Sequence, residues 1–165
     1  MSKIRIGFLT TTNKDNYQPF RNQPTTALHL LTITENYFKD RVEVSLIDLR
    51  GLDEEYVIYH VPEKDIYLYS TTTPHFSEYK RHLNKIREIY PDAKHIAGGP
   101  HVNIFPEEGE KIFDAIILKE GEHSIIKAID DVLNSRLKRV YDQTGSINVN
   151  DYPHPDRKYL NKKAV

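Results

Sequence analysis

Short apolar runs that resemble β-strands alternate with segments of helical periodicity, and this alternation constrains the fold more than any other feature of the sequence. Neighbouring parallel strands need a long crossover connection, usually a helix, and such crossovers are right-handed. The strand-like runs cover residues 4–10, 42–49, 65–70, 93–97 and 113–118. The alternation therefore predicts an α/β, flavodoxin-like or Rossmann-like domain with a doubly wound, five-stranded parallel sheet.

Amphipathic segments supply the predicted helices. The apolar residues that recur at steps of three and four in the clearest segment are Phe76, Tyr79, Leu83, Ile86 and Tyr90. This stripe is expected to pack on the sheet, whereas Glu78 and the other charged residues face solvent. Thr73 is the predicted N-cap and Pro74 the first helical residue. Other helices begin near residue 24 and cover 125–133, residues 52–64 are either a turn of helix or a loop, and residues 137–141 are a candidate extra edge strand.

The chain has the length of one ordinary domain. It contains 165 residues, and we place the domain boundary after residue 147. Residues 148–165 contain Pro153 and Pro155, many charges and little apolar periodicity. This composition predicts a linker that leaves the domain.

Charge and composition exclude several function classes. The formal net charge is −1, with 23 basic and 24 acidic residues, so nucleic-acid binding is disfavoured. The absence of cysteine excludes thiolate zinc sites, thiol nucleophiles and cysteine-held iron–sulfur clusters within this sequence. No apolar stretch approaches the ~20 residues of a membrane span, and the first residues have no signal-peptide layout, so we expect a cytoplasmic protein without a membrane partner.

Hydroxyl-rich or glycine-rich loops follow the predicted strands. The carboxyl ends of parallel strands share one edge of the sheet, which is where open α/β sheets bind ligands. Glycines let a bulky ligand approach the main chain there. The sequence therefore predicts one large pocket at this edge. Its candidate residues are Thr11, Thr12, Ser70, Thr72, Thr73, Gly98, Gly99, Pro100, His101, Glu120, Gly121 and Glu122.

Taken singly, each of these loops also has a structural explanation. The Gly98-Gly99-Pro100 sequence is typical of a tight turn. The hydroxyls after the third strand are typical of a strand end followed by a helix cap. Glu120 and Glu122 place negative charge near a helix N-terminus, which is favourable without any ligand. The functional interpretation depends on the loops occurring together.

Taken together, these segments resemble the amino-terminal cobalamin-binding domain of radical S-adenosylmethionine enzymes. The segments that carry the resemblance are residues 69–76, 90–91, 98–101, 105–108, 113–114, 120–122 and 151–157. The resemblance implies that the corrin ring lies across the carboxyl edge of the sheet and that the dimethylbenzimidazole tail enters between the strands. Ser70 and Thr72 match the polar loop after the third strand, Gly98 and Gly99 match the loop after the fourth, and Gly121 and Glu122 match the loop near the corrin amides.

Two departures narrow this expectation. In the methionine-synthase and mutase branch of cobalamin proteins, an Asp-x-His-x-x-Gly loop after the first strand supplies a histidine to cobalt, but residues 11–23 contain neither histidine nor glycine. We therefore expect cobalamin without a protein histidine on cobalt. Relatives hold their radical cluster on Cys-x-x-x-Cys-x-x-Cys, which this sequence lacks. The S-adenosylmethionine and the 4Fe-4S cluster would belong to a separate radical domain, in cis or in trans.

The resemblance thus predicts a carrier of cobalamin rather than a complete catalyst. The parent enzyme is expected to be a radical methyltransferase, and no residue of this sequence is assigned a catalytic or metal-ligating role. Two alternatives stay open. One is a flavodoxin-like flavin, nucleotide or receiver module, although receivers need acidic residues where this chain has Thr10–Thr12 and an aspartate where it has Ser70–Thr72. The other is a metal enzyme that uses His75, His101 and His123.

Overall fold

Parallel strands form a single sheet in the computed structural model, which describes residues 2–142 and 145–160. The order across the sheet is β2-β1-β3-β4-β5-β6, and every neighbouring pair is parallel. This is the predicted doubly wound sheet with the extra edge strand added beside β5. The strands are β1 (Ile4–Leu9), β2 (Val42–Ile47), β3 (Ile66–Ser70), β4 (Lys94–Gly98), β5 (Ala115–Leu118) and β6 (Val140–Asp142).

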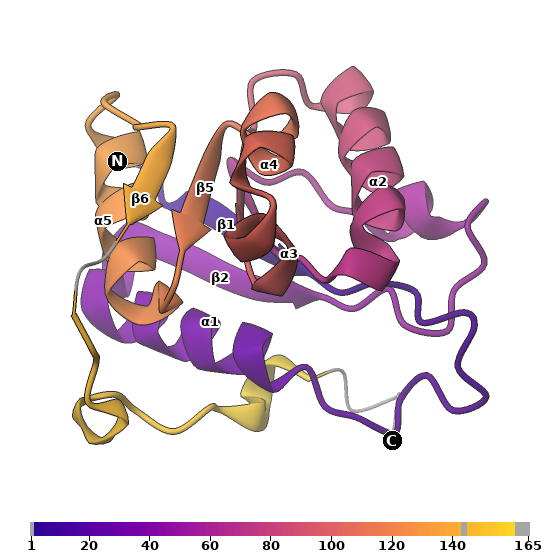
Figure 1. Ribbon diagram of the computed structural model, residues 1–165, viewed down its shortest axis with the longest axis horizontal. Helices are drawn as coiled ribbons and strands as arrows, with labels where there is room; N and C mark the ends of the chain where they lie inside the picture. The colour runs from indigo at the N-terminus through magenta and orange to yellow at the C-terminus, as the bar shows by residue number, and fades with distance from the viewer. Residues whose placement is uncertain (1, 143–144, 161–165) are drawn as a thin grey trace.

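Helices cover both faces of the sheet (Figure 1). One face carries α1 and α5, and the other carries α2, α3 and α4. The helices are α1 (Thr25–Phe38), α2 (Phe76–Ile89), α3 (Pro100–Ile104), α4 (Pro106–Ile112) and α5 (Gly121–Leu133). Short 3₁₀ turns cover Lys39–Arg41, Val57–His60, Thr73–His75, Val149–Asp151 and Arg157–Tyr159. The stretch 52–64 is therefore a loop with one such turn.

Alternation along the strands divides the apolar side chains between two cores. Phe8, Leu68 and Ile117 pack toward α1 and α5. Tyr67 and Tyr69, which flank Leu68 on β3, pack toward α2. Successive strand side chains point to opposite faces, so both faces of the central strands are buried, as in other sheets covered by helices on each side.

Two local predictions are wrong. The segment after β4 is not a simple loop, because α3 begins at Pro100 and α4 begins at Pro106. Both helices are too short to show helical periodicity in the sequence, although proline at a first helical position is a recognised start signal. Thr73 is not the cap of α2 either. It lies in a 3₁₀ turn, and α2 begins at Phe76 without a side-chain cap.

The segment after β6 returns to the domain instead of leaving it at once. In Figure 1 this segment, drawn in yellow, runs along α1. The Asp156 amide donates to Thr32 Oγ1 at 2.9 Å, and Tyr159 Oη donates to Glu35 Oε2 at 2.7 Å. The described part of the predicted linker, residues 148–160, is therefore docked, and residues 161–165 lie outside the described residues. No helix in the described ranges is long and apolar enough to cross a membrane.

Candidate ligand-binding site

A pocket of about 590 Å³ opens at the carboxyl edge of the sheet, on the face covered by α1 and α5. This volume lies within the range of about 300–1,000 Å³ typical of small-molecule sites. The position agrees with the rule that open α/β sheets bind ligands at this edge. Apolar side chains from four neighbouring strands form its floor, namely Phe8, Leu68, Ile96 and Ile117.

The two adjacent glycines after β4 have different structural roles. A Cβ added to Gly98 would meet the Ile117 carbonyl oxygen at 3.5 Å, an ordinary contact, so a side chain there is tolerated by the backbone. Gly99 has a φ of 98°, and its added Cβ would lie 2.7 Å from the amide nitrogen and the carbonyl oxygen of Thr71. Gly99 is therefore required by the chain's own packing, whereas Gly98 leaves one wall of the pocket bare.

Several of the predicted site residues line this pocket. They come from the ends of β3, β4 and β5 and from the first turns of the helices that follow. Those that do so are Ser70, Gly98, Gly99, Pro100, Glu120, Gly121 and Glu122. Thr11 lines a smaller neighbouring pocket of about 310 Å³, which shares Ser70 with the larger one.

The remaining predicted residues do not line this pocket, and their role in ligand binding stays a prediction. Thr12 is only 3% exposed, and its amide donates to Glu78 Oε1 at 2.6 Å. Thr72 is hydrogen-bonded to His75 Nδ1 at 3.0 Å, while Thr73 is hydrogen-bonded to His101 Nδ1 at 3.2 Å.

His101 shows why these side chains miss the pocket. Its ring stacks on Phe76, the first residue of α2, with centroids 3.8 Å apart. Its Nε2 faces Glu108 Oε2 at 3.3 Å. After Ser70 the chain turns onto the face that carries α2, so the loop hydroxyls and this imidazole belong to that side of the sheet.

The pocket also has a wall that the sequence did not indicate. Thr25, Thr26, His29 and Leu30 of α1 contribute to it. His29 Nε2 lies 3.4 Å from Glu122 Oε1, so the pair joins α1 to α5 at the pocket. The position of His29, near the start of the helix that follows a polar loop at the carboxyl edge, is the signal that could have identified it.

Glu122 carries the clearest unsatisfied group of the site. Its side chain is 14% exposed, and its Oε2 is buried without a hydrogen-bond partner among the described residues. A buried acceptor left without a donor is unfavourable. A ligand that brings an N–H or O–H donor to this oxygen would remove that penalty.

A hydrogen bond between a side chain and the backbone joins two residues that line the pocket. Asn103 Oδ1 accepts a hydrogen bond from the Lys119 amide at 2.6 Å, which joins α3 to the loop after β5. Lys119 adopts a φ of 62°, and its ammonium group pairs with Asp142 Oδ1 at 2.6 Å. Both residues line the pocket, and neither was predicted.

The three histidines proposed as an alternative metal site do not converge. His101 packs against Phe76 on the α2 side. His123 lies in the first turn of α5 and lines a different pocket beside β6, with Lys127 and Asp142. His75 is hydrogen-bonded to Thr72. The hypothesis of a three-imidazole metal site is therefore wrong.

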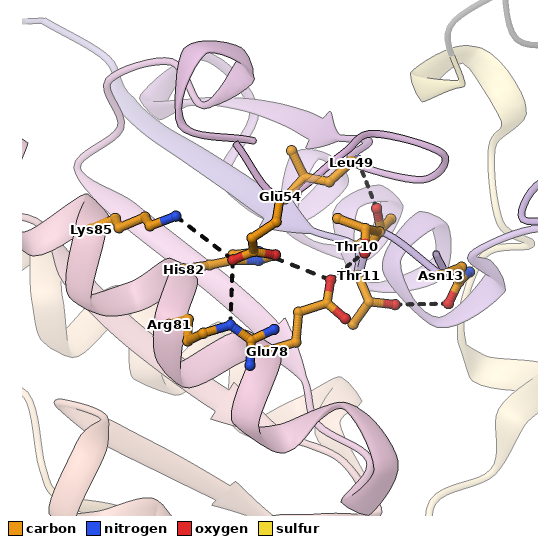
Figure 2. A network of polar contacts seen from close by, with 10 residues as sticks. Thr10, Thr11, Asn13, Leu49, Glu54, Glu78, Arg81, His82 and Lys85 are labelled. Carbon is orange, nitrogen blue, oxygen red and sulfur yellow. Dashed lines mark hydrogen bonds and ion pairs between the residues drawn. The ribbon is translucent and has the colours of Figure 1, made fainter. Parts of the chain in front are cut away.

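A separate polar network ties the loop after β1 to α2 (Figure 2). His82 Nε2 lies 3.1 Å from Glu54 Oε2 and 4.0 Å from Glu78 Oε1. Arg81 and Lys85 pair with the other oxygen of Glu54.

The placement of Glu78 corrects the prediction that it faces solvent, because its side chain is only 13% exposed. Glu54, Glu78 and His82 bring their ligand atoms within 4.8 Å of one another. Two cations already compensate Glu54, and Glu78 accepts the Thr12 amide. We therefore interpret the cluster as a structural tie that holds the loop.

A second buried network lies between β3 and β4. His95 stacks against Tyr67, with ring centroids 5.3 Å apart, and its Nδ1 is hydrogen-bonded to Tyr69 Oη at 2.8 Å. Burial lowers the pKa of His95 to about 4 and raises the pKa of Tyr69 well above its ordinary value. Both groups are therefore neutral near pH 7, and they fix two neighbouring strands beneath the site.

Comparison with known proteins identifies solved structures that are similar to this one. No protein-family model and no curated protein matches the sequence. The structure is similar to that of OxsB, a cobalamin-dependent S-adenosylmethionine radical enzyme with aqua-cobalamin bound, with a TM-score of 0.62 and 19% identity. The match covers 82% of this chain and 19% of that enzyme, so the chain spans about a fifth of its length.

A second solved structure, the amino-terminal domain of a hypothetical protein from Thermotoga maritima, is 26% identical, with a TM-score of 0.48. The match covers 78% of this chain and 98% of that domain. The likeness to OxsB establishes the α/β fold with its parallel sheet, which the sequence predicted.

Proposed function

We propose that the chain binds cobalamin at the carboxyl edge of its sheet and serves as the cobalamin-binding module of a B12-dependent radical enzyme. The observation that carries the proposal is the pocket of about 590 Å³, with its apolar floor and the bare wall at Gly98. The similarity to part of an enzyme whose structure contains bound aqua-cobalamin supports the same function.

The residues present fit the cofactor. Phe8, Leu68 and Ile117 offer an apolar surface to the dimethylbenzimidazole base. The unpartnered Oε2 of Glu122 offers an acceptor to an amide N–H, and the corrin ring carries such amides around its edge. The pocket is too small for the whole cofactor, so the corrin would lie on the rim. Bound cobalamin would supply the cobalt chemistry, while these residues bind and orient it.

The proposal includes a cobalt without a protein histidine. The loop between β1 and α1 contains no histidine. His29 is the imidazole that lines the pocket within the described ranges, and its Nε2 is already engaged by Glu122 Oε1. We therefore expect the absorbance spectrum of the bound cofactor to be unchanged in His29→Ala, apart from any loss of affinity.

Methyl transfer and a radical domain are further parts of the proposal. The sequence has no cysteine, so a 4Fe-4S cluster and its S-adenosylmethionine would be held by another domain, in cis or in trans. This arrangement assigns binding, orientation and protection of the cofactor to the present chain. A cytoplasmic location is consistent with the same role.

The pocket is less suited to a terminal phosphate dianion such as that of flavin mononucleotide. Glu120 and Glu122 both line it, and carboxylates repel a dianion more strongly than the singly charged phosphodiester of cobalamin. A receiver module is also disfavoured, because Thr10 and Thr11 occupy the positions where its acidic residues would lie.

The test is titration with hydroxocobalamin, followed by gel filtration. We expect the cobalamin absorbance to elute with the protein in a 1:1 complex in wild type and in Gly98→Ala. Gly98→Leu should lose the colour, because its side chain projects from the bare wall, while circular dichroism shows that the fold is retained. Separation of all colour from wild-type protein at micromolar concentration would refute the proposal, and co-elution of flavin mononucleotide instead would replace it with the flavin alternative.

A further inference from the structure

The segment that follows β6 forms part of the pocket wall. Pro155 lines the pocket together with His29 of α1. The Tyr152 ring meets the His29 ring edge to face, with centroids 6.4 Å apart. A segment predicted to be a linker therefore contacts the same imidazole that pairs with Glu122 at the site.

This segment is anchored to α1 beyond the pocket. The Asp156 amide donates to Thr32 Oγ1 at 2.9 Å, and the same hydroxyl donates to the Leu28 carbonyl at 2.7 Å. One α-helical turn further along, Glu35 accepts a hydrogen bond from Tyr159 Oη at 2.7 Å and pairs with Lys158.

The anchors define two groups of residues with different roles. Pro155 lines the pocket and is placed to contact a ligand, whereas Tyr152 contacts His29, which lines the pocket. Thr32 and Glu35 do not line the pocket and act only through the segment they hold. The pairing with Lys158 lowers the pKa of Glu35, so this anchor is fully charged near neutral pH.

Such an arrangement couples docking of the segment to binding of a ligand. Half-exposed hydrogen bonds and ion pairs are individually weak, so the docked segment is only modestly favoured over an undocked one. A ligand that contacts Pro155 binds the docked state better and therefore favours docking. By reciprocity, an interaction that holds the segment down raises the affinity for the ligand by the same factor.

We propose that residues 148–160 are a wall of the binding site that docks on α1 and retains the ligand. In this proposal Pro155 contacts the ligand, Tyr152 supports His29, and Thr32 and Glu35 are positioning residues. The proposal rests on the proposed function in that the ligand used to test it is cobalamin. It assigns these residues a role in binding that a linker would not have.

Two threonines of α1 provide a matched pair of variants. Thr32 and Thr34 are both buried, and each donates its hydroxyl to the carbonyl four residues earlier, at 2.7 Å. Only Thr32 also accepts the Asp156 amide. Thr32→Val and Thr34→Val therefore lose the same bond within the helix, but only Thr32→Val loses the contact with the segment.

The experiment measures dissociation of aqua-cobalamin from the full chain, together with hydrogen exchange of the amides of residues 148–160. Thr32→Val should release the cofactor up to about fivefold faster than Thr34→Val, which is the factor for one hydrogen bond of about 1 kcal/mol. Tyr159→Phe, a change outside the pocket that removes the hydrogen bond to Glu35, should act in the same direction. Cobalamin should slow exchange in residues 148–160 of wild type.

The possible failures are distinct. If wild type retains cobalamin but Thr32→Val, Thr34→Val and Tyr159→Phe release it at the wild-type rate, the wall is passive and the inference is wrong while the proposed function stands. An exchange rate of residues 148–160 that does not respond to cobalamin would have the same meaning. If wild type does not retain cobalamin at all, the proposed function and the inference both fail.

Discussion

Alanine substitution at Gly99 and, separately, at Gly98 tests which of the two adjacent glycines serves the backbone and which leaves space for a ligand. Gly99 has φ 98° and ψ 176°, a region populated almost only by glycine. Gly98 has no such constraint, and its added Cβ meets nothing closer than the Ile117 oxygen at 3.5 Å.

The magnitude for Gly99→Ala follows from two costs. Holding a non-glycine residue in this region costs about 1–3 kcal/mol. The added Cβ would also lie 2.7 Å from two backbone atoms of Thr71. Thr71 cannot move away easily, because its amide donates to the Gly98 carbonyl and its carbonyl accepts the His101 amide. Relieving this clash costs about 1–3 kcal/mol more, so the sum is about 2–6 kcal/mol.

Gly98→Ala is expected to change stability only slightly. Removing a glycine from a strand at an unstrained position lowers the entropy of the unfolded chain and changes stability by less than about 1 kcal/mol. Urea unfolding followed by circular dichroism measures both variants. A typical domain is stable by about 5–15 kcal/mol, so Gly99→Ala should show a large fall in midpoint or fail to fold. Equal midpoints for the two variants would refute the assignment of different roles to the glycines.

Three further predictions concern stability. The pKa of His95 is about 4 in the folded state and about 6.5 in the unfolded state, so the unfolded state binds more protons between these pH values. The free energy of unfolding should therefore fall by roughly 3 kcal/mol as pH drops from 6.5 to 4. Urea titrations at stepped pH measure this fall, and His95→Gln should flatten it. Hydrogen bonding to Arg5 lowers the folded pKa of Asp65, so the contribution of this carboxylate to the free energy of unfolding is complete above pH 3.8 and is lost as pH falls through the folded pKa. Asp65→Asn should be less stable than wild type at pH 7 and should lose less stability below pH 3.8. Equal acid profiles of the two proteins would contradict this. Gly109→Ala should lower the thermal midpoint by an amount equivalent to about 1–3 kcal/mol, because its Cβ would lie 2.8 Å from Val102 Cγ1, and an unchanged midpoint would show that Val102 repacks freely.

The strands and the helices with clear periodicity were predictable because each has a local signature. The stripe from Tyr79 to Ile86 is buried as expected, and the five strand-like runs correspond to β1 to β5. The helices α3 and α4 were missed because five and seven residues are too few to establish a period. Their proline starts were present in the sequence, but a proline also marks a turn.

The face of the sheet toward which each strand side chain points could not be predicted in the same way. In β3, Ile66 to Tyr69 are all buried, so the pattern contains no polar alternation that would show which side chains point toward which helices. Ser70 lies at the pocket, while Thr72 and Thr73 lie on the side of α2. When both faces of a sheet are covered, hydrophobicity identifies the strand but not its orientation.

The α/β architecture and the edge of the sheet at which a pocket would form could be predicted from the sequence, because strand and helix periodicity and loop glycines are local properties. Tertiary packing determines which face holds the pocket, that His29 pairs with Glu122 across it, and that Pro155 returns to line it. These contacts join residues about a hundred positions apart in the sequence, and local sequence patterns do not indicate contacts over such separations. Packing of α1 against α5 and against the returning segment brings them together.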